Sequence, residues 1–542
     1  MRHARAIGLM GLALALAACH RTKGPSASGL PFPSFAIQES TPEPAPSVPP
    51  TWGGLRPGPH EVGYRMVVLD DPSRPYHLHT EPEPYPRPVV AGVWYPARPD
   101  TGQARRVGDY FELTAPRPEL EAFATVASAY LRGVVVDEAM SMPAELLRPK
   151  ERDRLERVLT STTFARSEAT LAVDGAPVLL AHAGLGGALA DNLVLYEYLA
   201  SRGWVVVAGL FQQATGNGVH VGWDPVTSLR DLDLLREGVP AELGVEPQGF
   251  AVIGHSYGAQ AALVYATLPG RVDAVVSLDS TIENASAEAP WWREPTQAPW
   301  LDRATEIRVP ALLFASPEPE RSFFDAMGSA PRELVLAPGL DHDDFVGIAG
   351  AFGPLAGRCP SPVACRDLHT RHLTVVATAA RFLDATLRPE RPRDDAAVAR
   401  HLAAVGFTRE RVSEPAPSTP VEPLPALEPG PDCRDAGSCD PVLVAVTRAW
   451  ELRALGRSQD ALAELDGVLA TETELAWLLH DTRGILLASR GAFVEATEAF
   501  DRSARVPGPR GRQRRRRDRA AELAGLEPRP DEPEPEPDEP EP

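Results

Sequence analysis

The sequence predicts an α/β protein with a mainly parallel sheet covered by helices on both faces, followed by a small all-α helical-repeat region. Two observations predict this fold class. Short apolar strands alternate with helical segments from Pro177 to Leu336, which is typical of a parallel sheet with crossover helices. Later in the chain, Val442 to Val506 has the pattern of four helices. A length of 542 residues allows more than one domain.

A sharp turn with the sequence Gly254-His255-Ser256-Tyr257-Gly258 joins a strand to a helix in the first of these regions. Phe250 to Ile253 before it is a continuous apolar run, and Gln260 to Leu268 after it is rich in Ala and Leu. Glycines on both sides let the strand and helix backbones approach closely. Such a turn lifts the Ser256 hydroxyl above the sheet edge at a helix N-terminus, so Ser256 is the candidate nucleophile. An ordinary loop is the alternative interpretation.

The first residues have the pattern of an export signal. Arg2 and Arg5 precede an apolar run that ends at Ala18 and is too short for a transmembrane helix. Leu16-Ala17-Ala18-Cys19 resembles a bacterial lipobox, which implies that residues 1–18 are a lipoprotein signal peptide and that Cys19 is lipidated. The expected location is a membrane-anchored lipoprotein on the periplasmic side or the cell surface. A plain secretory signal is the alternative.

Residues 19–58 are rich in Pro, Ser and Gly and are expected to form a tether. Strand-like alternation follows at Val62 to Leu69 and at Val89 to Tyr95, with a Pro-rich loop from Asp71 to Pro88 between them. These two segments are expected to be the opening antiparallel strands of the sheet. Residues 106–170 are expected to be a mainly helical insertion beside the mouth of a pocket.

The alternating region then gives each element in turn. The expected strands are Val178–Ala181, Trp204–Ala208, Phe250–Ile253, Val272–Leu278, Ala311–Ala315 and Glu333–Leu336, and the expected helices between them include Leu193–Ser201 and Leu229–Glu237.

A serine nucleophile needs a base and an acid that orients the base. Asp279 directly follows a strand, so it should lie at the C-terminal edge of the sheet, where ligands bind. His342 follows a later strand and is the candidate base. His255 is the rival base, but it adjoins Ser256 in the chain and is expected to point elsewhere and pack. The rival acids share the loop of His342: Asp341, Asp343 and Asp344.

Two backbone N–H groups are expected to form an oxyanion hole. One is that of Tyr257, which follows the nucleophile. The other is that of Leu185, in the turn Gly184-Leu185-Gly186, although a simple tight loop is the alternative there.

With these pieces in place, residues 59–388 resemble the platelet-activating-factor acetylhydrolase and dienelactone-hydrolase-like branch of the α/β-hydrolases. The resemblance implies Ser256 as nucleophile, His342 as base and Asp279 as acid, with N–H donors at Leu185 and Tyr257. One departure is His182-Ala183, because the family usually has His immediately before the glycine turn. The matching segments are Gly92-Val93-Trp94-Tyr95-Pro96-Ala97, Gly184-Leu185-Gly186, Leu199-Ala200-Ser201-Arg202-Gly203-Trp204, Gly254-His255-Ser256-Tyr257-Gly258, Leu278-Asp279 and His342-x-x-Phe345.

Four cysteines besides Cys19 form two closely spaced pairs, Cys359 with Cys365 and Cys433 with Cys439. An even number of cysteines in an exported chain suggests two disulfides, and local pairing is the simplest of three connectivities. Zinc is the weaker alternative, because neither pair has the spacing of zinc ligands.

Beyond residue 388 the composition changes. Residues 389–440 are rich in Pro, Glu and Ala and are expected to be a linker. Residues 441–508 resemble tetratricopeptide repeats, because Gly456 and Gly491 recur at the same spacing as Ala461 and Ala496. Such repeats imply a protein partner, and a helical hairpin pair docked on the hydrolase is the alternative. Residues 509–542 are expected to be a disordered tail, basic and then acidic.

These features predict a serine hydrolase that cleaves small-molecule or lipid carboxylic esters, with short acyl or phospholipid-type acetyl esters as candidates. The alternative is an inactive lipoprotein scaffold that binds a partner. A net charge of −20 argues against nucleic acid as a partner, and no metal or nucleotide motif predicts a cofactor. Trp291, Trp292 and Trp300 are expected either to line an acyl pocket or to pack against the insertion.

Overall fold

The computed structural model describes residues 48–99, 101–212, 225–280, 303–316, 321–388, 390, 394–413, 441–468, 476–505 and 510–526. Several expectations lie outside these residues: the signal and Cys19, the tether up to residue 47, the three tryptophans at 291, 292 and 300, and the pair Cys433 and Cys439. In the part of the chain that is described, no helix is long and apolar enough to cross a membrane.

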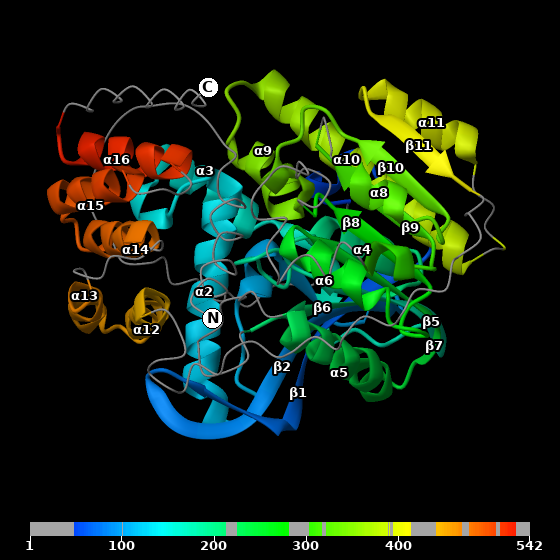
Figure 1. Ribbon diagram of the computed structural model, residues 1–542, viewed down its shortest axis with the longest axis horizontal. Helices are drawn as coiled ribbons and strands as arrows, with labels where there is room; N and C mark the ends of the chain where they lie inside the picture. The colour runs from blue at the N-terminus through cyan, green and yellow to red at the C-terminus, as the bar shows by residue number, and fades with distance from the viewer. Residues whose placement is uncertain are drawn as a thin grey trace, which may run out of the picture.

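One mixed sheet forms the centre of the molecule, and its middle is parallel (Figure 1). Its strands lie in the order β11-β10-β9-β8-β7-β5-β6-β2-β1-β4-β3. β5 to β10 are parallel to one another, whereas β2 runs antiparallel to both β6 and β1. The bounds are β1 Glu61–Leu78, β2 Glu81–Ala97, β3 Gln103–Arg106, β4 Thr162–Ser167, β5 Gly175–His182, β6 Val205–Leu210, β7 Glu246–His255, β8 Ala274–Leu278, β9 Ala311–Ala315, β10 Arg332–Leu336 and β11 Thr408–Val412.

The strands of the sheet centre are apolar on both faces. In β6, Val205 and Val207 belong to one buried cluster, and Val206 and Ala208 belong to another, as the alternation of side chains along a strand requires. α5 (Pro225–Leu243) and α6 (Tyr257–Tyr265) cover the first face. α4 (Leu193–Ser201) and α10 (Pro362–Leu387) cover the second. This arrangement confirms the predicted α/β fold class.

The expectation of a Pro-rich loop between the first two strands is wrong. β1 and β2 continue as a long hairpin in which Tyr76 pairs with Tyr85 and Leu78 with Glu81 (Figure 1). The prolines are tolerated because this part of the hairpin lies beyond the sheet and is irregular between Asp71 and Pro75. Burial of Tyr76 and Leu78 fixes the extended conformation.

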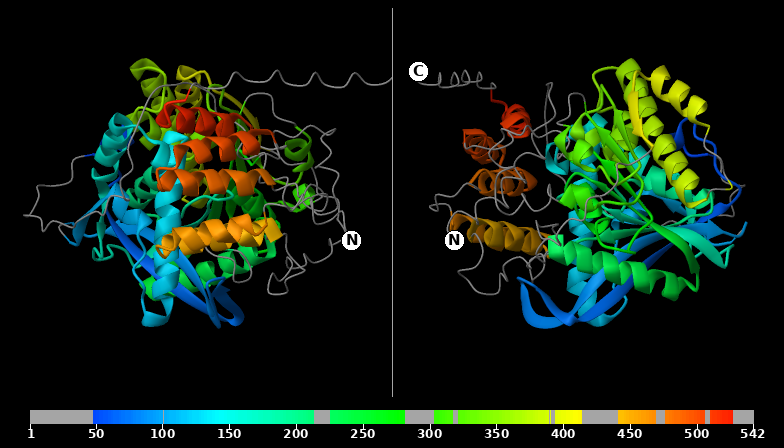
Figure 2. Two further views of the ribbon diagram at one scale, coloured as in Figure 1. Left: turned by 90° about the vertical axis from the view of Figure 1, so that its left-hand side faces the viewer. Right: turned by 45° about the vertical axis from the view of Figure 1, so that its right-hand side comes forward.

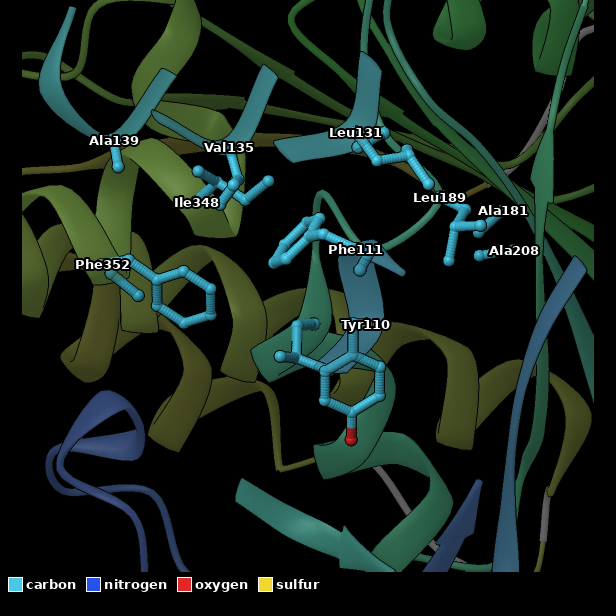
Figure 3. Packing of buried hydrophobic residues seen from close by; sticks show 14 of the residues in the cluster. Tyr110, Phe111, Leu131, Val135, Ala139, Ala181, Leu189, Ala208, Ile348 and Phe352 are labelled. Carbon is cyan, nitrogen blue, oxygen red and sulfur yellow. The ribbon is translucent and has the colours of Figure 1, made fainter. Parts of the chain in front are cut away.

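The segment between β2 and β5 is helical apart from two strands, β3 and β4. Its longest helix is α2 (Glu121–Met140). Figure 3 shows Leu131, Val135 and Ala139 on the side of α2 that packs into the core near Ile348 and Phe352. The other elements of this segment are η2 (Val107–Phe111), η3 (Pro118–Leu120), η4 (Ala144–Leu146) and α3 (Pro149–Leu159).

A series of short elements leads from the sheet to α10. Cys359, just before that helix, forms a disulfide with Cys365 in its first turn. Local pairing is therefore confirmed for this cysteine pair. The remaining short elements of this half are η1 (Pro50–Trp52), η7 (Arg303–Glu306), α8 (Ser322–Ala326), η8 (His342–Phe345), the π-helical turn η9 (Ile348–Phe352) and α9 (Gly353–Ala356).

The expected linker is wrong over its first part. Residues 395–412 form α11 (Asp395–Ala404) and the edge strand β11, which pairs antiparallel with β10. β11 pairs with β10 because the buried carboxylate of Glu333 in β10 forms ion pairs with Arg409 and Arg411 of β11. Leu402 and Phe407 add buried apolar surface. This segment, although polar in sequence, is thus held to the sheet by ion pairs with one buried carboxylate.

The C-terminal region is a stack of helices beside α2 (Figure 2). Four of them occupy the predicted helical segment: α12 (Pro441–Ala454), α13 (Ser458–Asp466), α14 (Ala476–Ser489) and α15 (Phe493–Arg505). The expectation of a disordered basic tail is wrong at its start, because Arg510–Leu523 forms helix α16. Carboxylates of other elements neutralise its arginines: Arg516 pairs with Asp137 and Asp481, and Arg519 with Glu151.

Candidate active site

Ser256 sits at the tip of the turn between β7 and α6. Its backbone has φ 53° and ψ −122°, a conformation that a non-glycine residue adopts only when its surroundings impose it. The surroundings here are tight: a Cβ on Gly254 would lie 2.0 Å from the carbonyl oxygen of Gly258, and one on Gly258 would lie 2.2 Å from that of Ala183. The Ser256 N–H donates to the Leu278 carbonyl of β8 at 3.1 Å. The geometry is that of a nucleophile elbow.

Asp279 and His342 meet beside this turn. The Nδ1–H of His342 donates to Oδ2 of Asp279 at 2.6 Å. Asp279 is fully buried at the end of β8, and its N–H donates to the carbonyl of Phe314 in β9 at 2.9 Å. Its second carboxylate oxygen accepts the backbone N–H of Ser316 at 3.2 Å. The carboxylate is therefore fixed from two neighbouring strands, and it fixes the imidazole in turn.

The rival acids in the His342 loop have other contacts. Oδ2 of Asp344 accepts the N–H of Asp341 at 3.0 Å, and its Oδ1 forms an ion pair with Arg358. Asp344 therefore closes the short helical turn η8. Asp343 lines the cavity at the active site.

His255 lies against His342 with ring centroids 4.6 Å apart, and its Nε2–H donates to the backbone carbonyl of His342 at 2.9 Å. Burial, and secondarily the proximity of His342, lowers the pKa of His255 to about 4, so its ring is neutral at neutral pH. His255 therefore contacts the backbone of His342 and helps to hold the loop in which His342 lies.

The Gly184–Gly187 turn follows β5 and faces Ser256. The N–H of Gly187 donates to the carbonyl of Gly184 at 2.9 Å, which closes the turn. A Cβ on Gly184 would lie 3.4 Å from Cβ of Ser256, so the turn and the elbow are in contact. Tyr257 is the first residue of α6, where backbone N–H groups have no partner within the helix. Leu185 lies in the turn that contacts Ser256, and Tyr257 directly follows Ser256 in the chain.

Asp191 is a buried acid that the sequence did not single out. Its Oδ1 accepts the N–H of Ala188 at 2.5 Å, and its backbone carbonyl accepts the N–H of Ile348 at 3.0 Å. Burial raises the pKa of Asp191 to about 8. Asp191 thus contacts the residue after the glycine turn through its side chain and η9 through its backbone carbonyl, and no local motif marks that role.

His182, the departure from the family pattern, is a packing residue. Its ring stacks on Phe211 at 3.6 Å, and its Nδ1–H donates to the carbonyl of Ala183 at 2.7 Å. Nε2 accepts from the hydroxyl of Ser228 at 3.0 Å. Burial lowers the pKa of His182 to about 4, which keeps the ring neutral.

Ser256, His342 and the glycine turn line one cavity of about 480 Å³. The rest of its lining comes from α2 and, unexpectedly, from the C-terminal helices. α12, α14 and α16 contribute Trp450, Trp477 and Gln513, among others. The tetratricopeptide-like pattern gave no indication that these helices reach the site. Within the described residues, no cluster of His, Cys, Asp and Glu could hold a metal ion.

No known protein-family model matches the chain, and no curated protein matches it by sequence. Among solved structures, a ferulic acid esterase from Streptomyces cinnamoneus is similar at 20% identity and a TM-score of 0.41, over 66% of this chain and 97% of the esterase. A puromycin-hydrolyzing peptidase from Mycobacterium tuberculosis is similar at 15% identity and a TM-score of 0.31, over 60% of this chain and 39% of the peptidase.

Proposed function

We propose that this protein is a serine hydrolase that cleaves carboxylic esters through an acyl-enzyme. The observation that carries the proposal is the 2.6 Å hydrogen bond between His342 and Asp279, with His342 and the elbow serine Ser256 on one cavity. A base whose Nδ1–H is held by a buried carboxylate presents Nε2 as the proton acceptor.

In the proposed reaction, Ser256 Oγ attacks the ester carbonyl carbon while its proton passes to Nε2 of His342. The oxyanion of the tetrahedral intermediate accepts hydrogen bonds from the backbone N–H groups of Leu185 and Tyr257. The intermediate collapses as the imidazolium gives its proton to the leaving alcohol. Water then attacks the acyl-enzyme, with His342 again accepting a proton, and the carboxylic acid and free Ser256 are released. Thioesters and amides would follow the same steps.

The natural ester is proposed to be a small or lipid-derived one, with phospholipid-type acetyl esters among the candidates through the resemblance of residues 59–388. Lipidation at Cys19 would place the enzyme at a membrane surface, which suits such a substrate. A protein that binds the tetratricopeptide-like helices is a further proposed partner.

A fluorophosphonate probe tests the proposal, because it reacts covalently with an activated serine. We expect the full-length protein to be labelled and to hydrolyse p-nitrophenyl acetate. Ser256→Ala should lose the label, and turnover should fall on the order of a million-fold, as loss of a triad nucleophile does. Ser489→Ala, which changes an exposed serine, is the matched control.

The alternative function, an inactive scaffold, makes the opposite prediction. The folded wild-type protein would then take up no probe, and its ester turnover would equal that of Ser256→Ala. A label that persists in Ser256→Ala would also defeat the assignment of the nucleophile.

A further inference from the structure

The cavity at Ser256 is built from two parts of the chain that are far apart in sequence. The β5 turn, the elbow and the His342 loop form its catalytic end. α2 forms one side, and α12, α14 and α16 form the remainder, as the helical stack beside α2 in Figure 2 allows. The volume of about 480 Å³ lies within the range of small-molecule sites, about 300–1,000 Å³. The C-terminal helices therefore bound the space that a substrate occupies.

The helices are firmly docked in this position. Their buried apolar residues, such as Leu452 and Leu486, belong to the same cluster as the core around α2. Polar contacts add to this: Glu451 of α12 accepts the backbone N–H of Thr80 at the tip of the β1–β2 hairpin at 2.9 Å. Arg519 of α16 donates to the carbonyl of Leu146 at 2.8 Å. A wall held by both kinds of contact can select substrates by shape.

The two arginines that this wall contributes to the cavity lining form ion pairs. Arg516 of α16 binds Asp137 of α2 at 2.8 Å and also pairs with Asp481 of α14. Arg453 pairs with Glu145. Since both guanidinium groups are already compensated, they are not free to bind an anionic group of the substrate. Trp450, Trp477 and Ile485 supply the apolar surface between them.

Gln513 differs from these arginines because its side chain forms no ion pair or hydrogen bond among the described residues. It lines the cavity, and its side chain is only 1% exposed. Among the described residues, neither its amide nitrogen nor its amide oxygen has a hydrogen-bond partner. A buried amide without partners costs free energy, so a group that both donates and accepts hydrogen bonds is its natural complement.

We propose that α12, α14 and α16 form the acyl-binding wall of the esterase site, and that the Gln513 carboxamide binds a neutral hydroxyl or amide group on the substrate's acyl chain. The preferred substrates are thus esters whose acyl group is mainly apolar and carries one such polar group. Gln513 is a specificity residue in this proposal and takes no part in the chemistry. The proposal rests on the proposed function.

The first test compares two p-nitrophenyl esters on the full-length protein, one with an unsubstituted hexanoyl group and one with a 6-hydroxyhexanoyl group. Gln513→Met keeps the volume and removes both hydrogen-bonding atoms. We expect it to lower kcat/KM for the hydroxylated ester by about 10- to 100-fold relative to the unsubstituted one, mainly through KM. Gln212→Met is the matched control, because Gln212 is also buried and without a side-chain partner among the described residues but does not line the cavity.

The second test fills the cavity from α12. Ala454 lines it and is partly exposed, so Ala454→Phe should fold, shorten the cavity and lower kcat/KM for hexanoyl esters at least 10-fold while acetyl esters are spared. If acetyl turnover is Ser256-dependent but neither variant changes the acyl preference, the wall proposal is overturned and the esterase stands. If no Ser256-dependent turnover exists, the proposed function itself fails.

Discussion

The substitution Asp279→Asn tests the acid of the proposed triad. It replaces one carboxylate oxygen by an amide nitrogen and hardly changes the volume of the side chain. An Asn there can present an N–H toward His342 and favour the wrong tautomer, which costs about 10⁴-fold in kcat in a triad. We expect a loss of that order in p-nitrophenyl acetate turnover. Asp343→Asn, which changes a loop carboxylate at the same cavity, should lose less than about 10-fold. A larger loss for Asp343→Asn would move the acid to the loop.

Candidate residues that a local motif or a position directly after a strand marks could be predicted from the sequence, and residues whose burial depends on the docking of distant elements could not. Ser256 is marked by a local pattern, and Asp279 and His342 by their positions after strands. Gln513 carries no such mark, because its burial depends on α16 docking against α2 and α14. Asp191 was not predicted for the same reason. Its role depends on hydrogen bonds with Ala188 and Ile348, and Ile348 comes near it only in the folded chain.

The elbow is the element in which backbone geometry matters most. Gly258→Ala would place a Cβ 2.2 Å from the Ala183 carbonyl oxygen, and the strand and helix would have to separate. We expect this variant to lose about 1–3 kcal/mol in the free energy of unfolding and to lose fluorophosphonate labelling. Gly54→Ala, where a Cβ meets nothing within 4 Å, should keep both. Normal labelling of Gly258→Ala, measured beside its urea unfolding curve, would contradict the proposed strain.

Strands in the sheet centre were predicted well because continuous apolar runs carry their own signal; Ala311–Ala315 has the predicted bounds. The hairpin arm and β11 were missed because prolines and charges dominate them locally. They are fixed by distant partners, Tyr76 through burial and Arg409 through Glu333. α16 was likewise predicted to be disordered, because a run of arginines is usually exposed to solvent. The carboxylates that pair with these arginines belong to distant parts of the sequence.

At the scale of the whole molecule, Glu451 couples the C-terminal helices to the hairpin. Burial raises the pKa of Glu451 to about 7 from an ordinary 4.5. In the unfolded chain the Glu451 carboxyl ionises near pH 4.5, whereas in the folded chain it stays protonated up to about pH 7. The protonated carboxyl therefore contributes fully to stability below pH 4.5, and this contribution is lost as the pH rises to about 7. The free energy of unfolding should fall by about 3 kcal/mol relative to Glu451→Gln across this window. Urea unfolding at a series of pH values measures it.

Glu498→Gln is the control for that experiment, because Glu498 is exposed on α15. The same pH series is measured for this variant. A constant difference for Glu451→Gln would show that Glu451 does not titrate in this window.

Cys19 governs the proposed location of the whole molecule. Several acyl chains on a lipoprotein cysteine bind a membrane far more firmly than one chain does. We expect Cys19→Ser, expressed in a bacterial host, to leave the membrane fraction or to accumulate as an unprocessed precursor. Cys365→Ser, which changes a cysteine outside the signal, should fractionate like wild type. Membrane association of Cys19→Ser at the wild-type level would eliminate the lipid anchor as its cause.

The position of α16 has a consequence for the synthesis of the proposed esterase. A ribosome releases Ser256, Asp279 and His342 long before it releases Gln513, because the last helix of the wall ends at Leu523. In the proposed esterase, the residues of the triad would therefore be synthesised before the helices of the acyl-binding wall. A chain that stops before α12 would then be the least selective form of the proposed enzyme.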